Sequence, residues 1–381
     1  MDLHSLREQI DKIDDQIAAL YVERMNTVKL IGEAKARGEG ALNDPNREKK
    51  IIARVTKIAE EDVKVYMKQV FTAMFETSKA YQTKSVRLES EVRKNLEEIK
   101  ANGIKPFPVS ATVACQGVEG AYAGIAADRL FEIADVTFFK TWEAVFSAVE
   151  AGLCEYGVLP IENSTVGSVN DVYDLMKEHK FHIVRSINLR VSHQLVANHG
   201  VELGDIKEVV SHEQAIRQCA GFIKTLGKVK VTVLENTAAA AKYVSESGRR
   251  DIAAICSREC GALYGLTIVK SNVQDENSNY TRFICISKDF NVFAGSQKIS
   301  IMTTIPHVPG SLNKLLGKFS MQGLNLTKLE SRPLAKHNFE FMFYFDFEGS
   351  IENEGVLNLI AELENSSEHF VFLGSYAEMT V

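Results

Sequence analysis

The N-terminal segment carries the hydrophobic repeat of an α-helix. Apolar residues recur at three- and four-residue spacing from Leu6 to Ile31, and the first glycine of the chain is Gly32. This pattern predicts one amphipathic helix over about residues 3–35. At 1.5 Å per residue the helix is roughly 50 Å long, and the rest of so small a segment cannot cover it. We therefore expect a partner chain along its apolar face.

Two shorter helices are predicted next. Asp44 and Pro45 have the residue types of a helix N-cap and a first helical residue. Apolar residues at helical spacing then mark the inner face of each helix. These residues are Ile51, Ile52, Val55 and Ile58 in the second helix and Val63, Met67, Val70 and Met74 in the third.

Polar side chains occupy places that the helical pattern reserves for apolar ones. Arg24 and Lys35 are eleven residues apart on the first helix, so they lie about 20° apart around its axis. Glu48 falls on the inner face of the second helix, and Ser78 and Gln82 continue that of the third. Buried cations are costly unless paired, and one glutamate cannot balance two of them, so a bound anion is a natural partner. The alternative is that these groups reach solvent or pair with one another.

From about residue 109 to residue 289 the pattern changes to short apolar strands that alternate with helices, which predicts an α/β domain. Residues 183–197 alternate almost strictly between apolar and polar, so we expect one long strand that bridges two lobes around a cleft. His193 falls on the apolar side of this strand and is predicted to be a core histidine. The other predicted strands are Thr112–Cys115, Val136–Phe139, Gly157–Ile161, Glu208–Val210, Lys230–Leu234, Asp251–Cys256 and Phe283–Ile286.

Hydrogen-bonding residues stand at the ends of several of these strands. A buried parallel strand that ends in such residues places a ligand at the carboxyl edge of the sheet. The structural alternative is that they form turns and helix caps, and Ser211 with Gln214 has the spacing of a capping box. The residues are Glu162, Asn163, Ser164 and Thr165; Ser211 and Gln214; Asn236 and Thr237; and Asn279, Thr281 and Arg282 at the start of the last strand.

The C-terminal part has the order strand, helix, strand, strand, helix, strand, which is that of an α+β ferredoxin-like domain. Gly310 opens its first helix, whose N-terminus suits a carboxylate; the alternative is a plain dimerisation module. A charged, helix-favouring connector closed by Pro106 and Pro108 precedes the α/β part. The pattern thus predicts a helical domain at 1–90, a linker at 91–108, an α/β domain at 109–289 and an α+β domain at 297–381.

Composition narrows the class of protein. The chain is 45% hydrophobic and 25% charged, as in globular proteins, and its net charge of −6 argues against a nucleic-acid partner. It contains no apolar run of membrane-spanning length, and its first residues are charged where a signal peptide would be apolar. Neither zinc-type cysteine spacing nor a strand followed by GxGxxG is present. We expect a cytoplasmic protein that needs no cofactor or metal and does not bind membranes.

Residues 1–90 resemble the all-helical chorismate mutase family. The motifs that carry the resemblance are Leu6-Arg7, Glu23-Arg24, the segment from Gly32 to Lys35, Asp44 with Arg47-Glu48, and Ser78 with Gln82. The resemblance implies a dimeric domain whose chorismate site consists of Arg7, Arg24, Lys35, Asp44, Arg47, Glu48, Ser78 and Gln82.

The resemblance also implies a role for each of these side chains. Arg24 and Arg47, with Arg7 reaching in from the other protomer, would hold the two carboxylates of chorismate. Lys35 and Gln82 would donate hydrogen bonds to its ether oxygen, where charge gathers as the C–O bond breaks. A Claisen rearrangement needs a folded substrate and positive potential rather than a nucleophile. Asp44 and Ser78 would complete the pocket, and the catalytic residues would be Lys35, Glu48 and Gln82.

Residues 112–288 resemble prephenate dehydratase, which implies a bilobal domain like a periplasmic binding protein. The motifs are the segments 117–122, 159–164, 211–215, 236–239 and 279–283; Val118, Ala121 and Ala123 depart from the usual first motif, whereas Tyr122 is kept. Thr281 would donate a proton to the leaving hydroxyl of prephenate, directly or by a relay through water or a neutral Glu162. The resemblance implies that prephenate is bound by Glu162, Asn163, Ser164, Thr165, Ser211, Gln214, Thr237 and Arg282.

Residues 297–381 resemble the ACT regulatory family through the segments 307–312 and 330–333. The resemblance implies that phenylalanine, the end product of the pathway, inhibits the enzyme by binding at His307, Gly310, Ser311, Leu312, Glu330 and Ser331. The whole chain thus resembles a bifunctional enzyme of phenylalanine biosynthesis, expected as a homodimer or homotetramer. A mutase fused to prephenate dehydrogenase is disfavoured because the dinucleotide motif is missing. A non-catalytic bilobal sensor is disfavoured by the polar residues on the helical faces.

Overall fold

A computed structural model of the chain describes residues 2–37, 44–83, 87–276, 278–333 and 341–381. The chain divides into two compact units, residues 1–98 with 301–372 and residues 99–300 with 373–381. None of the described helices is long and apolar enough to cross a membrane. Within the described ranges, no group of three or more His, Cys, Asp or Glu side chains is placed to hold a metal ion.

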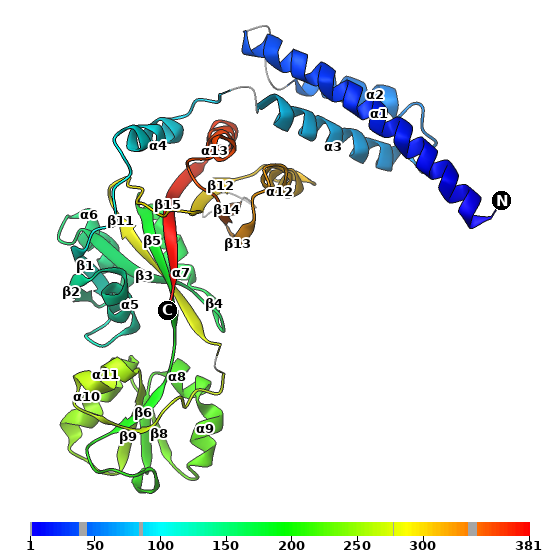
Figure 1. Ribbon diagram of the computed structural model, residues 1–381. Coiled ribbons are helices and arrows are strands. Elements are labelled where there is room, and N and C mark those ends of the chain that lie inside the picture. The colour runs from blue at the N-terminus through cyan, green and yellow to red at the C-terminus, as the bar shows by residue number, and fades with distance from the viewer. Residues whose placement is uncertain (1, 38–43, 84–86, 277, 334–340) are drawn as a thin grey trace. The chain divides into compact units, whose positions relative to one another are not determined.

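The first unit begins with the three predicted helices, α1 (Leu3–Ala36), α2 (Pro45–Val55) and α3 (Lys64–Thr83) (Figure 1). Asp44 caps α2 as expected, because its carboxylate accepts a hydrogen bond from the backbone N–H of Arg47 at 3.0 Å. The predicted inner position of Ile58 is wrong: its side chain is 82% exposed, because α2 ends at Val55 and the helical spacing no longer applies there.

The apolar face of α1 is largely uncovered within its own unit. α3 packs along α1, but Leu6, Ile10, Ile13, Ile17 and Leu20 remain between 44 and 65% exposed. An uncovered apolar row of this length is typical of a surface that meets another protein.

The C-terminal part of this unit has the predicted element order. Its strands pair in the order β13-β14-β12-β15, and β13 and β14 are antiparallel. β12 and β15 both run across the boundary between the two units. The elements are β12 (Lys298–Thr304), α12 (Ser311–Met321), β13 (Leu326–Pro333), β14 (Phe341–Glu348), α13 (Glu354–Ser366) and β15 (Phe370–Thr380).

The charged connector forms a helix, α4 (Glu91–Ala101), that is docked rather than free. Arg93 is fully buried, and its guanidinium pairs with Glu97 at 2.8 Å and Glu354 at 2.6 Å and donates to Asn358 at 2.6 Å. The last two residues belong to α13, so α4 is fastened to that helix.

The second unit consists of two α/β lobes, as predicted. In the first lobe the strand order is β15-β5-β11-β3-β1-β2, and in the second it is β10-β6-β9-β7-β8. The first lobe contains β1 (Ser110–Gln116), α5 (Tyr122–Leu130), β2 (Ile133–Phe139), α6 (Trp142–Glu150), β3 (Tyr156–Asn163), β4 (Gly167–Ser168), α7 (Asn170–Glu178), β5 (His182–Arg190) and β11 (Tyr280–Ser287). The second lobe contains β6 (Gln194–Ala197), η1 (Leu203–Asp205), β7 (Glu208–Ser211), α8 (Glu213–Gln218), α9 (Ala220–Thr225), β8 (Lys230–Val233), α10 (Thr237–Ser247), β9 (Ile252–Cys256), α11 (Arg258–Leu263) and β10 (Thr267–Lys270).

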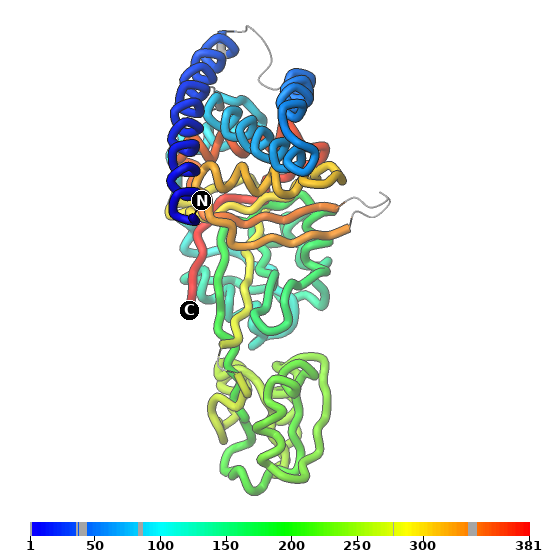
Figure 2. The backbone as a smooth tube through the Cα atoms, turned by 90° about the vertical axis from the view of Figure 1, so that its right-hand side faces the viewer, coloured from blue at the N-terminus to red at the C-terminus, as the bar shows by residue number. Residues whose placement is uncertain are grey.

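The predicted single strand over residues 183–197 is instead two strands in different sheets. β5 ends at Arg190 and β6 begins at Gln194. Between them the N–H of Val191 bonds the carbonyl of Asn279 and that of His193 bonds the side chain of Gln274, so the ladder pattern is interrupted. The prediction that this stretch bridges the lobes is confirmed, and the return segment after β10 forms a second link (Figures 1 and 2).

Candidate active sites

The three N-terminal helices bring several of the predicted chorismate residues together. The guanidinium of Arg24 on α1 donates to the hydroxyl of Ser78 and, at 3.3 Å, to the carbonyl of Met74 on α3. Ser78 and Gln82 are buried although they are polar, and Lys35 is half-buried. α1 and α3 approach closely here, since a Cβ added to Gly32 would lie 3.2 Å from the side chain of Gln82.

Glu48 has a partner that the sequence did not suggest. The ammonium of Lys79 on α3 lies 2.8 Å from Glu48 on α2 and 3.2 Å from Glu76. Burial lowers the pKa of Lys79, but the two carboxylates outweigh burial and raise it above its ordinary value. A pair between two helices depends on how the helices pack, which the sequence does not show directly. The one signal for Lys79 was its place directly after Ser78 in the predicted site.

The other predicted chorismate residues lie outside this cluster. Arg7, Asp44 and Arg47 are exposed, and the carboxylate of Asp44 is used as the cap of α2. Arg7 is 17 residues before Arg24 and so lies roughly 100° away around α1. Within one chain it therefore does not face the cluster around Arg24.

In the second unit, Asn163 and Thr281 form the predicted contact. They are register partners on the antiparallel strands β3 and β11. The side-chain N–H₂ of Asn163 donates to the hydroxyl of Thr281 at 2.9 Å and to the side-chain oxygen of Asn279 at 2.8 Å. The side-chain oxygen of Asn163 accepts from the backbone N–H groups of Thr165 at 3.0 Å and Val166 at 3.1 Å. Asn163 therefore ties the loop after β3 to the start of β11.

Ser164 strengthens the same junction. Its hydroxyl donates to the carbonyl of Ser278 at 3.0 Å and accepts from the N–H of Tyr280 at 2.9 Å. Both bonds join the residue after β3 to the residues around the start of β11, so Ser164 lies near Thr281, as expected. The hydroxyl of Ser164 bonds main-chain groups in both directions.

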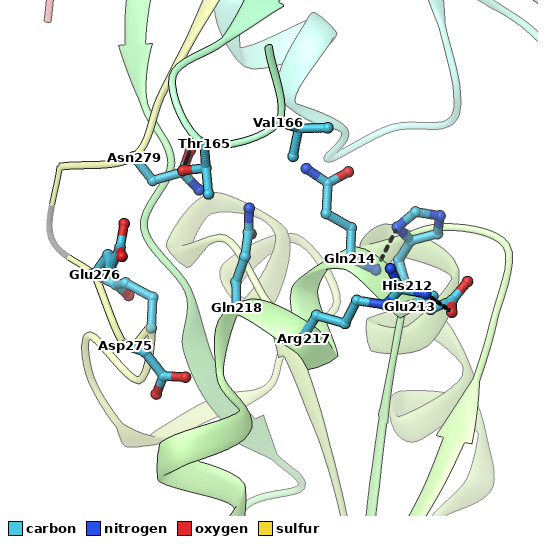
Figure 3. A pocket seen from close by; sticks show the side chains of 11 residues that line it. Thr165, Val166, His212, Glu213, Gln214, Arg217, Gln218, Asp275, Glu276 and Asn279 are labelled. Carbon is cyan, nitrogen blue, oxygen red and sulfur yellow. Dashed lines mark hydrogen bonds and ion pairs between the residues drawn. The ribbon is translucent and has the colours of Figure 1, made fainter.

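A hollow of about 490 Å³ opens beside this junction, between the two lobes (Figure 3). Thr165 and Asn279 line it from the first lobe, and Gln214 and Gln218 from α8. The side-chain nitrogens of Gln218 and Asn279 are buried and have no hydrogen-bond partner among the described residues. Two amide donors therefore face a space that a ligand with carboxylate oxygens could fill.

Gln218 is a candidate that sequence reasoning missed. It lies four residues after Gln214, and its side-chain oxygen is 2.9 Å from the ring nitrogen Nε2 of His193. His193 is buried, as predicted, and burial lowers its pKa. The helical spacing from Gln214 was the signal that could have identified Gln218.

Of the nine residues predicted for the dehydratase site, Thr165 and Gln214 line the hollow. Asn163, Ser164 and Thr281 form the junction beside it, and the remaining four are not among its lining residues. Ser211 is fully buried and donates to the carbonyl of Ile255 at 2.6 Å, so it belongs to the lobe's core. Thr237 opens α10 and does not line the hollow. Arg282 extends toward Tyr376 and Glu378, because neighbouring residues of a strand point to opposite faces. Glu162 is the register partner of Arg282 and precedes Asn163 in β3.

The variant loop before α5 packs against the second lobe. The hydroxyl of Tyr264 on the second lobe donates to the carbonyl of Glu119 in this loop at 3.4 Å. Tyr122, the first residue of α5, donates to the carbonyl of Ser192 between the lobes at 2.9 Å, and burial raises the pKa of Tyr122. Gly120 has φ +88°, and a Cβ there would lie 3.2 Å from the sulfur of Cys260.

The C-terminal domain has a separate hollow of about 440 Å³ at the start of α12. Its lining includes four of the residues predicted to bind phenylalanine: His307, Gly310, Ser311 and Leu312. Glu330 and Ser331 lie on the neighbouring strand β13, where Ser331 is the register partner of Phe343, another lining residue.

Comparisons with known proteins agree with the families of the first two domains. Residues 6–83 match the family model described as chorismate mutase type II, and residues 113–291 match the one described as prephenate dehydratase. The bifunctional chorismate mutase/prephenate dehydratase of Aquifex aeolicus is 32% identical over 378 residues, 98% of each chain. Arogenate dehydratase/prephenate dehydratase 2 of Arabidopsis thaliana is 39% identical over 276 residues, 69% of this chain and 72% of that protein.

Solved structures agree as well. Prephenate dehydratase from Arthrobacter aurescens in complex with L-Phe has a TM-score of 0.63, with 28% identity, and the match covers 70% of this chain and 90% of that one.

Fold, sites and relatives define the class: a helical mutase domain fused to a bilobal dehydratase domain. The chain belongs to the bifunctional chorismate mutase/prephenate dehydratase family, enzymes of phenylalanine biosynthesis. The resemblances of the first two domains, and the enzyme activities inferred from them, are thereby confirmed. The resemblance of residues 297–381 to the ACT family stays a prediction.

Proposed function

We propose that chorismate rearranges at the cluster of Arg24, Lys35, Glu48, Ser78 and Gln82. The observation that supports this location is the burial of polar side chains between α1 and α3, with Arg24 and Lys35 partly buried beside them. The cations would hold the substrate's carboxylates and stabilise the charge that develops on its ether oxygen. The proposed mutase domain, which is helical, spans residues 1–90.

We further propose that prephenate reacts at the hollow beside Thr281, within a dehydratase domain of residues 109–289. The bond to the ring carboxylate breaks, CO₂ leaves, and the electron pair aromatises the ring and expels the ring hydroxyl, which leaves as water after receiving a proton. Thr281 is suited to donate that proton or to relay it. Its oxygen accepts the hydrogen bond from Asn163 at 2.9 Å, so its own O–H is left to point to the leaving group. This bond is the observation that carries the assignment.

The direct test of both proposals uses the purified full-length chain. Chorismate should be consumed, and phenylpyruvate should form from either chorismate or prephenate. A chain that consumes chorismate but forms no phenylpyruvate would refute the dehydratase proposal, and the converse would refute the mutase proposal.

We propose that the chain acts as a homodimer or homotetramer in the cytoplasm. The exposed apolar row of α1 supports a second copy along this helix, and Arg7, also on α1, would then reach the partner's site. Sedimentation velocity at micromolar concentration should show at least a dimer, and Ile13→Glu in the row should weaken it because a charge would be buried at the contact. Glu23→Gln, an exposed change on the same helix, serves as the control. A wild-type chain that sediments as a monomer would contradict this proposal.

We also propose that phenylalanine inhibits the dehydratase by binding in the hollow at the start of α12. The support is the set of predicted residues around this hollow and the relative whose structure holds L-Phe. Gly310 has φ +86°, a conformation that a Cβ strains. Gly310→Ala should therefore raise the phenylalanine concentration for half-inhibition by about tenfold or more.

Gly317→Ala is the matched control for this prediction. Gly317 lies within α12, and a Cβ there would meet no atom within 4 Å, so inhibition should be unchanged. A wild-type enzyme that is indifferent to millimolar phenylalanine would contradict the proposal.

A further inference from the structure

The surroundings of Arg282 differ from those of a side chain that binds substrate. Its side chain is 9% exposed. Its guanidinium lies 2.9 Å from one carboxylate oxygen of Glu378 and donates to the hydroxyl of Tyr376 at 2.6 Å. Both partners belong to β15, the last strand of the chain.

Glu378 is the centre of a closed polar cluster. Its second oxygen accepts from the ammonium of Lys298 at 2.7 Å, and the oxygen facing Arg282 also accepts from the hydroxyl of Ser186 at 3.1 Å. Burial disfavours the charged carboxylate, but Arg282 and Lys298 outweigh this and lower the pKa of Glu378. The hydroxyl of Tyr376 is in turn 2.6 Å from that of Ser300. Arg282, Tyr376 and Ser300 are buried and Glu378 is partly exposed, so removing the carboxylate leaves the buried guanidinium without its ion-pair partner.

The order of the strands in the sheet shows how Arg282 on β11 contacts Glu378 on β15. β5 lies between β15 and β11, with Glu378 beside Ser186 on β5. The side chain of Arg282 therefore extends across β5 to make its ion pair. The pairing of β11 with β3 shifts register between Arg282 and Phe283, and such irregularities disrupt the local ladder of hydrogen bonds. A side-chain anchor at Arg282 replaces some of the lost restraint, immediately next to Thr281.

We infer that Arg282 is a positioning residue of the dehydratase reaction: its ion pair with Glu378 fixes the start of β11 and, through it, the hydroxyl of Thr281. This inference rests on the proposed role of Thr281. The last strand of the chain, which begins in the first compact unit and ends in the second, is then a component of the dehydratase. Arg282 does not bind a carboxylate of prephenate.

Four variants of the full-length protein test this inference: Arg282→Met, Arg282→Lys, Glu378→Gln and the double variant Arg282→Met/Glu378→Gln. Dehydratase kcat and KM are measured with prephenate. Arg282→Met and Glu378→Gln should each lower kcat by about 10- to 100-fold, because small displacements of a reacting group have effects of this size. KM should stay within about twofold. The double variant should be no slower than the slower single variant, and Arg282→Lys should recover part of the rate.

Arg249→Met is the matched control. Arg249 likewise pairs with a glutamate, Glu208, at 2.8 Å, but in the second lobe and away from Thr281. It should leave kcat and KM unchanged. Circular dichroism and thermal unfolding of each variant, compared with the wild type, show whether the dehydratase unit is folded; if Arg282→Met does not fold, Arg282→Lys and Glu378→Gln decide the question.

Two results overturn the inference. One is a rise of tenfold or more in KM for Arg282→Met with kcat unchanged, which would make Arg282 a substrate ligand. The other is normal kcat in Glu378→Gln. A wild-type chain without dehydratase activity would instead refute the proposed function itself, so the two failures are distinguishable.

Discussion

Thr281→Ala should lower dehydratase kcat by about 10²- to 10⁴-fold, the range that a positioned proton donor contributes. Alanine removes the hydroxyl of this residue and leaves one N–H of the Asn163 amide without its partner at 2.9 Å. KM for prephenate should change little, because Thr281 assists the leaving hydroxyl and not the substrate's carboxylates. The measurement is phenylpyruvate formation from added prephenate.

Three comparisons make this prediction specific. Thr281→Ser keeps the hydroxyl and should retain most of the activity. Thr267→Ala removes an exposed threonine on β10 of the second lobe and should have no effect. Chorismate consumption by Thr281→Ala should equal that of the wild type. If Thr281→Ala formed phenylpyruvate at the wild-type rate, another group would have to supply the proton.

Lys35→Ala should reduce mutase kcat by roughly 10²- to 10³-fold or more, which is the size of effect seen when one preorganised electrostatic donor is removed. The lost ammonium is the point charge proposed to face the ether oxygen of chorismate. Dehydratase activity on added prephenate should be unaffected, since prephenate then does not have to be produced by the first reaction.

Lys29→Ala is the control for this prediction, because Lys29 is an exposed lysine on the same helix. Both activities of this variant should match the wild type. Equal loss of both activities in Lys35→Ala, with the chain still folded by circular dichroism, would argue against two separate sites.

Local pattern was sufficient for most of the helices and strands, although it merged β5 and β6 into one strand, and for the contact between Asn163 and Thr281. The helical repeat predicted α1 and its length correctly. The polar residues at the end of β3 and the start of β11 indicated that Asn163 and Thr281 meet, and the two residues are register partners in the sheet. Such predictions succeed because each depends on the periodicity of a single element or on a short motif.

Predictions failed where the answer depends on which face meets which neighbour. Arg282 adjoins Thr281 in the motif, yet strand alternation turns it to the opposite face, toward Glu378. Ser211 looked like a helix cap or a ligand, but its hydroxyl donates to the neighbouring strand at Ile255. Lys79 was not considered because its partner Glu48 lies on another helix. Only the tertiary arrangement brings these pairs together.

The docking of α4 on α13 limits how the polypeptide could be divided into two independent proteins. Cutting after α4 would strip its buried arginine from Glu354 and Asn358 and expose the surface of α13 that α4 now covers. Genetic separation of the two catalysts should therefore leave α4 with the downstream piece, so that the free mutase ends before Ser90. In sequence the connector looks like a tether, but its arginine makes it an integral piece of the C-terminal domain, through α13.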